Sequence, residues 1–190
     1  MKRLFFIVVT ILLTIGNVTA QSKKELKAQA KRQELVAATT DEDGTRYFVN
    51  NAYSHTIKPT VTRCSRSGSV VKIDMMVWNT SDDKDQELVF SGTEYAFATA
   101  KAEDNLGNVY DGAKTRCMTF DFRGADKDKL YYTTSPEFVP AGGPLKITLS
   151  IKGVKPDATK FNELSFLVYS SLNNAGSLGM RFQIAELSIE

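Results

Sequence analysis

The chain has 190 residues, of which 42% are hydrophobic and 24% are charged, with 24 basic and 22 acidic side chains. This length has room for one domain with a real hydrophobic core, and the composition excludes a chain that is disordered throughout. The near balance of charge also excludes the strong basic field that draws proteins to nucleic acid.

The first twenty residues form a pattern of their own. A basic start with Lys2 and Arg3 precedes the apolar run 4–15, and small residues follow at 18–20. This pattern is typical of a secretory signal peptide, and the apolar run is short for a membrane span. Gln21 stands where a bacterial lipoprotein carries its acylated cysteine. We therefore predict a secreted or periplasmic mature chain, with no stable membrane anchor after cleavage of residues 1–20.

Cleavage would remove two basic residues and no acidic one, so the mature chain would carry 22 of each. Residues 21–44 are then predicted to form a short basic helix or a solvated tether. Ser22 and Glu25 match a capping box, and helix-forming residues continue as far as Ala38. The apolar face is poor, however, and an acidic stretch with Gly44 closes the segment. We place the domain boundary there.

From residue 45 to residue 190, short apolar runs alternate with turn residues. In the clearest strand, 145–152, the four aliphatic side chains share one face, while Thr148 and the other polar side chains are expected in water. Residues 70–79 form a second clear strand, and a change of phase near Ile184 predicts a bulge or a bend. Other predicted strands cover 47–49, 61–64, 95–102, 109–110, 116–122, 130–132, 164–169 and 180–189. The pattern predicts an all-β fold, an antiparallel β-sandwich over 45–190.

Several of these turns and strand ends occur in a familiar order. Cys64 precedes a turn at Gly68, a strand ends at Asn79, Ala-Glu-Asp-Asn-Leu-Gly-Asn-Val-Tyr covers 102–110, and Val-Pro-Ala-Gly covers 139–142. Over about residues 55–190 this order resembles the small exported immunoglobulin-like domains of unknown function that are common in Bacteroidota. The resemblance implies an immunoglobulin-like β-sandwich and a secreted or periplasmic accessory role. It carries over no catalytic residue.

Two cysteines, Cys64 and Cys117, allow one intramolecular disulfide in an oxidising compartment, although spacing alone does not decide whether they meet. With Trp78 between them, they follow the cysteine–tryptophan–cysteine order of antibody domains. Trp78, however, shares its strand face with polar side chains, and Cys117 lies opposite the apolar side chains of its strand. The pattern argues against antibody-like topology, and it predicts that a bridge would lie at a sheet edge or on an outer face.

The sequence contains few signs of a catalytic or metal-binding site. His55 is the only histidine, which excludes a multi-histidine zinc site, and no nucleophile-elbow motif surrounds a serine that it could activate. There is no phosphate-binding glycine loop and no Cys-x-x-Cys motif, so no cofactor is predicted. Two acidic loops are weak calcium candidates, although such residues are first of all turn formers. These loops contain Asp104, Asn105, Asn108 and Asp111, and Asp82, Asp83 and Asp85.

Three functions stay open on this basis. The favoured one is an exported, non-catalytic accessory domain that binds protein or glycan in the cell envelope or outside the cell. The others are a purely structural envelope protein and a carboxylate-dependent hydrolase. The candidate binding patch consists of Trp78, Met76, Tyr131 and Tyr132, because exposed aromatic side chains mark contact sites. The alternative is that the N-terminal segment or the loop before Leu130 covers Trp78.

Overall fold

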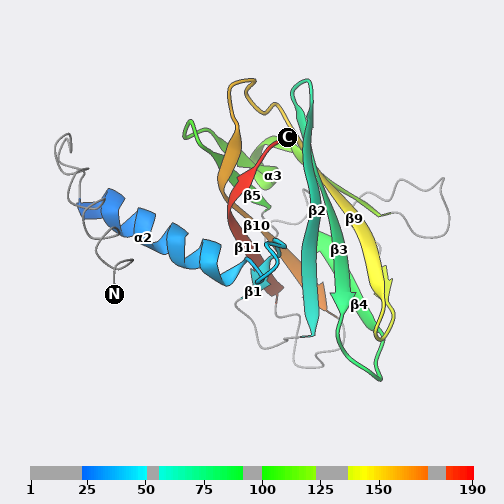
Figure 1. The fold of residues 1–190 in the computed structure, drawn as a ribbon. Coiled ribbons are helices and arrows are strands. Elements are labelled where there is room, and N and C mark those ends of the chain that lie inside the picture. Colours follow the sequence, from blue (N-terminus) through cyan, green and yellow to red (C-terminus); the bar gives the residue numbers. More distant parts are fainter. Residues whose placement is uncertain (1–22, 51–55, 92–99, 123–136, 171–178) are drawn as a thin grey trace, which may run out of the picture.

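The computed structural model describes residues 23–50, 56–91, 100–122, 137–170 and 179–190. Within them, two antiparallel sheets pack face to face as a sandwich (Figure 1), which confirms the predicted fold class. One sheet has four strands in the order β2-β3-β9-β7. These strands are β2 (Ile57–Ser67), β3 (Val70–Asn79), β9 (Pro144–Lys152) and β7 (Met118–Phe122).

The second sheet has the order β1-β11-β10-β4-β8, and β10 also pairs with β5, which in turn pairs with β6. Strands β4 and β5 lie along the same edge of β10, opposite residues 167–170 and 161–165 respectively. They therefore act as two parts of one interrupted strand. The strands are β1 (Val49–Asn50), β4 (Gln86–Ser91), β5 (Lys101–Asp104), β6 (Val109–Asp111), β8 (Glu137–Val139), β10 (Lys160–Ser170) and β11 (Gly179–Ser188).

The central strands of the two sheets follow the order of an immunoglobulin constant-type domain, and β1, β5, β6 and β8 are additions to it. The β2-β3-β9-β7 sheet corresponds to strands A-B-E-D, and β4-β10-β11 corresponds to C-F-G. The expectation against antibody-like topology therefore holds for the cysteines and the tryptophan, but not for the order of the central strands. Cys64 lies in strand A and Trp78 in strand B, so these residues do not occupy the positions of the antibody disulfide and core tryptophan. The antibody disulfide and core tryptophan do not determine the order of the strands, so their absence did not indicate a different order.

Two helices accompany the sheets in the part of the chain that the structure describes. The segment that was predicted as helix or tether contains α2 (Lys23–Ala38), which projects from the β11 side of the sandwich (Figure 1). The one-turn α3 (Gly112–Thr115) was not expected, since a single turn leaves no periodicity. Its N-cap is Asp111, whose side chain accepts a hydrogen bond from the backbone N–H of Lys114. No helix in the described ranges is both long and apolar enough to span a membrane.

Aromatic side chains from both sheets meet in the core. The ring of Phe166 in β10 lies 4.9 Å from that of Phe48, 5.4 Å from that of Phe120 in β7, and 5.6 Å from that of Phe182 in β11, between ring centroids. All four side chains are almost fully buried. Burying each such side chain contributes about 1.5–3 kcal/mol to folding, so this cluster is a main source of cohesion between the sheets.

The strand predicted most clearly, β9, departs from its expected exposure on one face. Its aliphatic side chains are buried as predicted, but Thr148 and Ser150 are also only 8% and 6% exposed. The prediction that they lie in water was wrong. Strand β9 is central, between β3 and β7, and Thr148 Oγ1 donates a hydrogen bond of 2.6 Å to Asp74 Oδ1 on the neighbouring strand. Short side chains in a central strand are shielded by longer neighbours.

The predicted irregularity near Ile184 is confirmed. Ile184 and Ala185 are both buried although they are adjacent, and Glu186 has a left-handed backbone with φ of 51°. Strand β4 was missed by the sequence analysis. Part of the predicted strand 95–102, and all of the predicted strand 130–132, lie outside the described residues.

Candidate functional site

The sequence-predicted patch centres on Trp78, near the end of β3 on the outer face of the four-stranded sheet. Trp78 is 40% exposed. It pairs with Lys58 of β2 on one side and with Pro144 of β9 on the other, and the next outward row places Met76 beside Lys146. Pro144 and Lys146 are exposed and Met76 is half-buried. We call these five residues (Lys58, Met76, Trp78, Pro144 and Lys146) the Trp78 face.

One margin of this face is held in place by the chain segment that follows α2. The Lys58 ammonium pairs with Asp41 at 2.9 Å and lies 4.1 Å from the centre of the Tyr47 ring. Both partners belong to residues 39–47, a hairpin-like segment joined by the Thr40–Arg46 bridge. The charge of Lys58 is thus engaged within the protein, whereas Lys146 projects from the other side of the face.

The structure brings together part of the predicted patch. Trp78 and Met76 lie on one outer face, as the alternation of β3 predicted. Tyr131 and Tyr132 lie outside the described residues, and so does His55. Lys58, Pro144 and Lys146 were missed, because only strand register places them next to Trp78.

The calcium candidate Asp104 organises a turn between β5 and β6. Its carboxylate accepts hydrogen bonds from Tyr110 Oη at 2.7 Å, from the backbone N–H groups of Leu106 and Asn108 at 2.9 Å each, and from Asn108 Nδ2 at 2.9 Å. Gly107, with φ of 81°, completes the turn. Burial raises the pKa of the Asp104 carboxyl, but these hydrogen bonds outweigh burial, so its pKa lies below the ordinary value.

Four of the other calcium candidates have structural partners too. Asn105 accepts from the backbone N–H of Thr159, and Asp111 caps α3. In the second acidic loop, Asp83 accepts from Ser81 Oγ, and Asp85 accepts from the backbone N–H of Ala141. No group of three or more histidine, cysteine or acidic side chains suited to a metal ion occurs among the described residues.

The candidate disulfide between Cys64 and Cys117 is contradicted, because both cysteines are free. Cys64 lies in β2 at one edge of the four-stranded sheet, and Cys117 directly precedes β7 at the other edge. Three strand spacings of about 4.8 Å separate these edges, far beyond the Cα separation that a disulfide spans. Cys64 is buried in the core, where burial raises the pKa of its thiol to about 12.

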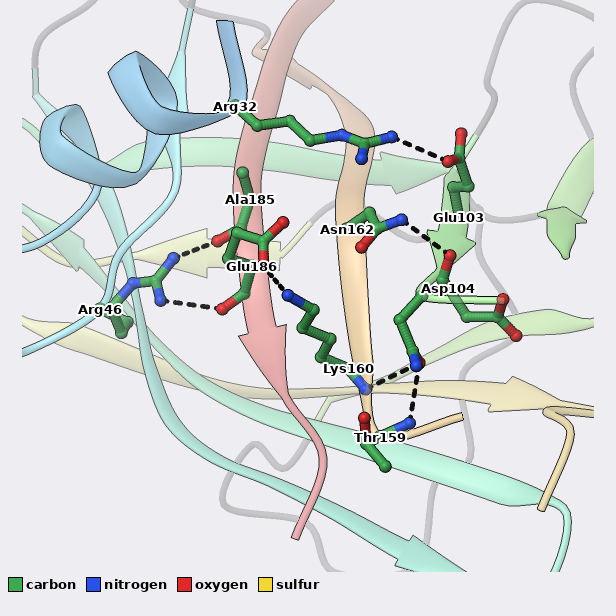
Figure 2. Close-up of polar contacts among 10 residues, drawn as sticks. Arg32, Arg46, Glu103, Asp104, Thr159, Lys160, Asn162, Ala185 and Glu186 are labelled. Carbon is green, nitrogen blue, oxygen red and sulfur yellow. Dashed lines mark hydrogen bonds and ion pairs between the residues drawn. The ribbon is translucent and has the colours of Figure 1, made fainter. Parts of the chain in front are cut away.

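A groove that the sequence did not predict lies between α2 and the outer face of the second sheet. Its volume is about 910 Å³. Gln29, Arg32 and Gln33 of α2 form one wall, and Asn105, Lys160 and Asn162 lie on the sheet side. Figure 2 shows Arg32 reaching over β10 to Glu103 of β5, with 2.9 Å between Nη2 and Oε1. Lys160 of β10 pairs with Glu186 of β11 in the same view.

The end of α2 is anchored next to this groove by Arg46. Its guanidinium donates to the backbone carbonyls of Ala185 and Glu186 (Figure 2), and also to the Thr39 carbonyl at 3.4 Å. Thr39 is fully buried, and its hydroxyl donates to the Leu35 carbonyl at 2.7 Å. Burial lowers the pKa of Arg46, while the Glu186 carboxylate opposes that shift. The position of the helix, and hence of the groove, depends on this contact.

Comparison with family models and with curated proteins finds no match. Among solved structures, the chain is similar to the ASH / PapD-like domain of human CEP192 (PapD-like domain 7). The identity is 14% and the TM-score 0.36, over 75% of this chain and 93% of that chain. So distant a likeness carries no statement about function.

Proposed function

We propose that the protein is an exported, non-catalytic immunoglobulin-like accessory module that holds a protein partner in the cell envelope through the Trp78 face. The observation that carries this proposal is a tryptophan 40% exposed on an open sheet face. Tryptophan is enriched among the residues that dominate protein interfaces. The described N-terminal segment leaves Trp78 40% exposed, while the loop before Leu130, the other cover considered from sequence, lies outside the described residues.

The surroundings of Trp78 support a protein partner over a glycan. Met76 and Pro144 extend the apolar surface to either side, and Lys58 and Lys146 form a charged margin. An apolar centre with a polar rim is the usual plan of a protein interface, whereas small-ligand sites are mostly concave. Glycan binding at this face is the second outcome of the test below.

Export completes the proposal and has its own test. The signal-peptide pattern of residues 1–20 supports cleavage before Gln21. N-terminal sequencing of the protein from envelope and medium fractions should return a chain starting at Gln21. A chain that retains Met1 and stays in the cytoplasm would contradict export.

Site-specific photo-cross-linking in the producing cell tests the Trp78 face directly. We expect a benzophenone amino acid at position 146 to yield one discrete adduct that contains a second polypeptide. The same group at Lys152, which lies on the same strand face away from Trp78, should yield none. Trp78→Ala should reduce the adduct at least about tenfold, in line with the loss of one hot-spot side chain.

Each other result has a definite meaning. An adduct that contains carbohydrate and no second polypeptide would replace the protein partner by a glycan. An adduct unchanged by Trp78→Ala, or equal amounts from positions 146 and 152, would overturn the proposed face. Because Trp78 is the single tryptophan of the chain, its emission also shows whether the isolated protein has the described exposure.

A further inference from the structure

The groove beneath α2 has the size and the mixed apolar and polar lining of a small-molecule site. About 910 Å³ lies within the roughly 300–1,000 Å³ typical of small-ligand pockets. Such pockets are mostly apolar with a few polar groups in set positions, and this one combines the aliphatic side chains of Ala28, Val36 and Ala37 with amide side chains from both walls, namely Gln29, Gln33, Asn105 and Asn162. The amide groups can therefore orient a ligand through hydrogen bonds, while the aliphatic side chains contact its carbon skeleton.

The charges of the groove cancel. Arg32 and Lys160 are balanced by Glu25 and Glu186 among the lining residues. Both cations are also engaged in ion pairs, Arg32 with Glu103 across the groove and Lys160 with Glu186 along its floor. An anionic ligand would have to compete with these carboxylates, and a cationic ligand with these cations. The lining therefore favours a neutral ligand.

Two asparagines on the sheet side offer one hydrogen-bond donor and one acceptor in fixed positions. The Asn105 side-chain oxygen accepts from the backbone N–H groups of Thr159 at 2.9 Å and Lys160 at 3.4 Å. The Asn162 side-chain nitrogen donates to the Asp104 carbonyl at 3.0 Å. Within the described part of the chain, Asn105 Nδ2 and Asn162 Oδ1 have no protein partner. Both residues line the groove.

These hydrogen bonds hold the side chains of Asn105 and Asn162 in position before a ligand binds. Each side chain is held by one end, so binding with the other end costs little additional conformational entropy. The turn that carries Asn105 is itself fixed by the buried Asp104 carboxylate and its four hydrogen bonds described above. A hydroxyl group both donates and accepts, so a ligand with several hydroxyl groups can use both the Asn105 donor and the Asn162 acceptor.

We propose that the groove between α2 and the β5-β10-β11 surface binds a short neutral oligosaccharide through Asn105 and Asn162. Size, neutral lining and the paired amide donor and acceptor all correspond to a polyhydroxyl ligand. This site is separate from the Trp78 face, which lies on the outer side of the other sheet, and it does not depend on the function proposed for that face.

The test uses the complete mature chain, labelled with ¹⁵N, and the neutral trisaccharides maltotriose, cellotriose and N,N′,N″-triacetylchitotriose as probes. We expect at least one trisaccharide at millimolar concentration to shift the side-chain amide signals of Asn105 and Asn162. Asn105→Asp keeps the oxygen that accepts from Thr159 and Lys160 but removes the free donor. It should weaken binding at least about tenfold while the melting temperature stays within a few degrees of wild type.

Controls separate this site from the Trp78 face and from other ligand classes. Trp78→Ala should leave trisaccharide binding unchanged. Trigalacturonate and blocked trialanine should produce smaller shifts than the best neutral trisaccharide. The proposal is overturned if no neutral trisaccharide shifts these amide signals, or if Asn105→Asp binds as well as wild type. Stronger binding of trigalacturonate or of the peptide would likewise overturn it, in favour of an anionic or a peptide ligand.

Discussion

Arg46 donates a hydrogen bond of 3.1 Å from Nη1 to the backbone carbonyl of Glu186, a residue 140 positions later in the chain. Glu186 is the one non-glycine residue with left-handed backbone within the described strands, at the place where β11 changes phase. The same guanidinium donates to the preceding carbonyl, that of Ala185. The irregular strand thus directs two successive carbonyls to one cation, which anchors the 39–47 segment and the end of α2.

Removing this cation should loosen the N-terminal part of the domain. We expect Arg46→Ala to lower the free energy of unfolding by about 2–4 kcal/mol, because buried carbonyls lose a charged donor. Arg46→Lys should recover part of this loss, since one ammonium cannot replace several guanidinium donors. Urea denaturation measures the effect. Arg63→Ala, at an exposed position of β2, is the matched control and should change stability by less than about 0.5 kcal/mol.

Aspartate on either face of β9 should destabilise the sandwich, for different reasons. Ile147→Asp would bury an unpaired charge in the core and should cost more than about 4 kcal/mol or prevent folding. Thr148→Asp would replace the donor to Asp74 by a second carboxylate and should cost about 1–3 kcal/mol.

Thr148→Asn is the matched control for the second change, because its amide can still donate to Asp74. It should stay within about 1 kcal/mol of wild type. Thermal unfolding at low and high salt distinguishes the two variants. Salt should raise the stability of Thr148→Asp more than that of Thr148→Asn, since screening weakens the repulsion between partly exposed carboxylates. Equal stability of the Thr148→Asp and Thr148→Asn variants would show that Asp74 does not interact with this position.

The Asp104 turn should make stability depend on acid. The pKa of Asp104 in the folded protein lies below its ordinary value, so the unfolded state binds the proton more readily. Its contribution to stability is therefore complete above the unfolded pKa of about 3.9 and is lost as pH falls through the lower folded pKa. Asp104→Asn should be destabilising at pH 7, because its amide nitrogen would face hydrogen-bond donors, and its stability should fall less steeply below about pH 5. Parallel pH profiles for wild type and variant would contradict this role.

The two thiols should stay reduced and should differ in reactivity. We expect the mass of the mature protein purified without reductant to show both thiols free. Alkylation with iodoacetamide should reach Cys117, which is half-buried, faster than Cys64, whose thiol is buried with a pKa raised to about 12. Unfolding in urea should abolish the difference. A disulfide-linked peptide containing both cysteines would contradict the described sheet order.

The groove shows which features a sequence pattern does not reveal. Asn105 and Asn162 belong to β-rich segments more than fifty residues apart, and Arg32 belongs to a helix whose apolar face is poor. Nothing in their local sequence distinguishes them from ordinary turn and surface residues. They form one site because β5 pairs with β10 and because Arg46 holds the end of α2 against β11.

The local alternation of apolar and polar residues determined much of the fold of this protein. It predicted the β-sandwich, the outward position of Trp78 and the irregularity near Ile184, because side chains alternate strictly along a strand and a change of phase has a local cause. Only the tertiary structure decided the immunoglobulin strand order, the separation of Cys64 from Cys117 and the burial of Thr148. These depend on which strands become neighbours, and that choice follows from packing between distant segments of the chain, which no single stretch of sequence contains.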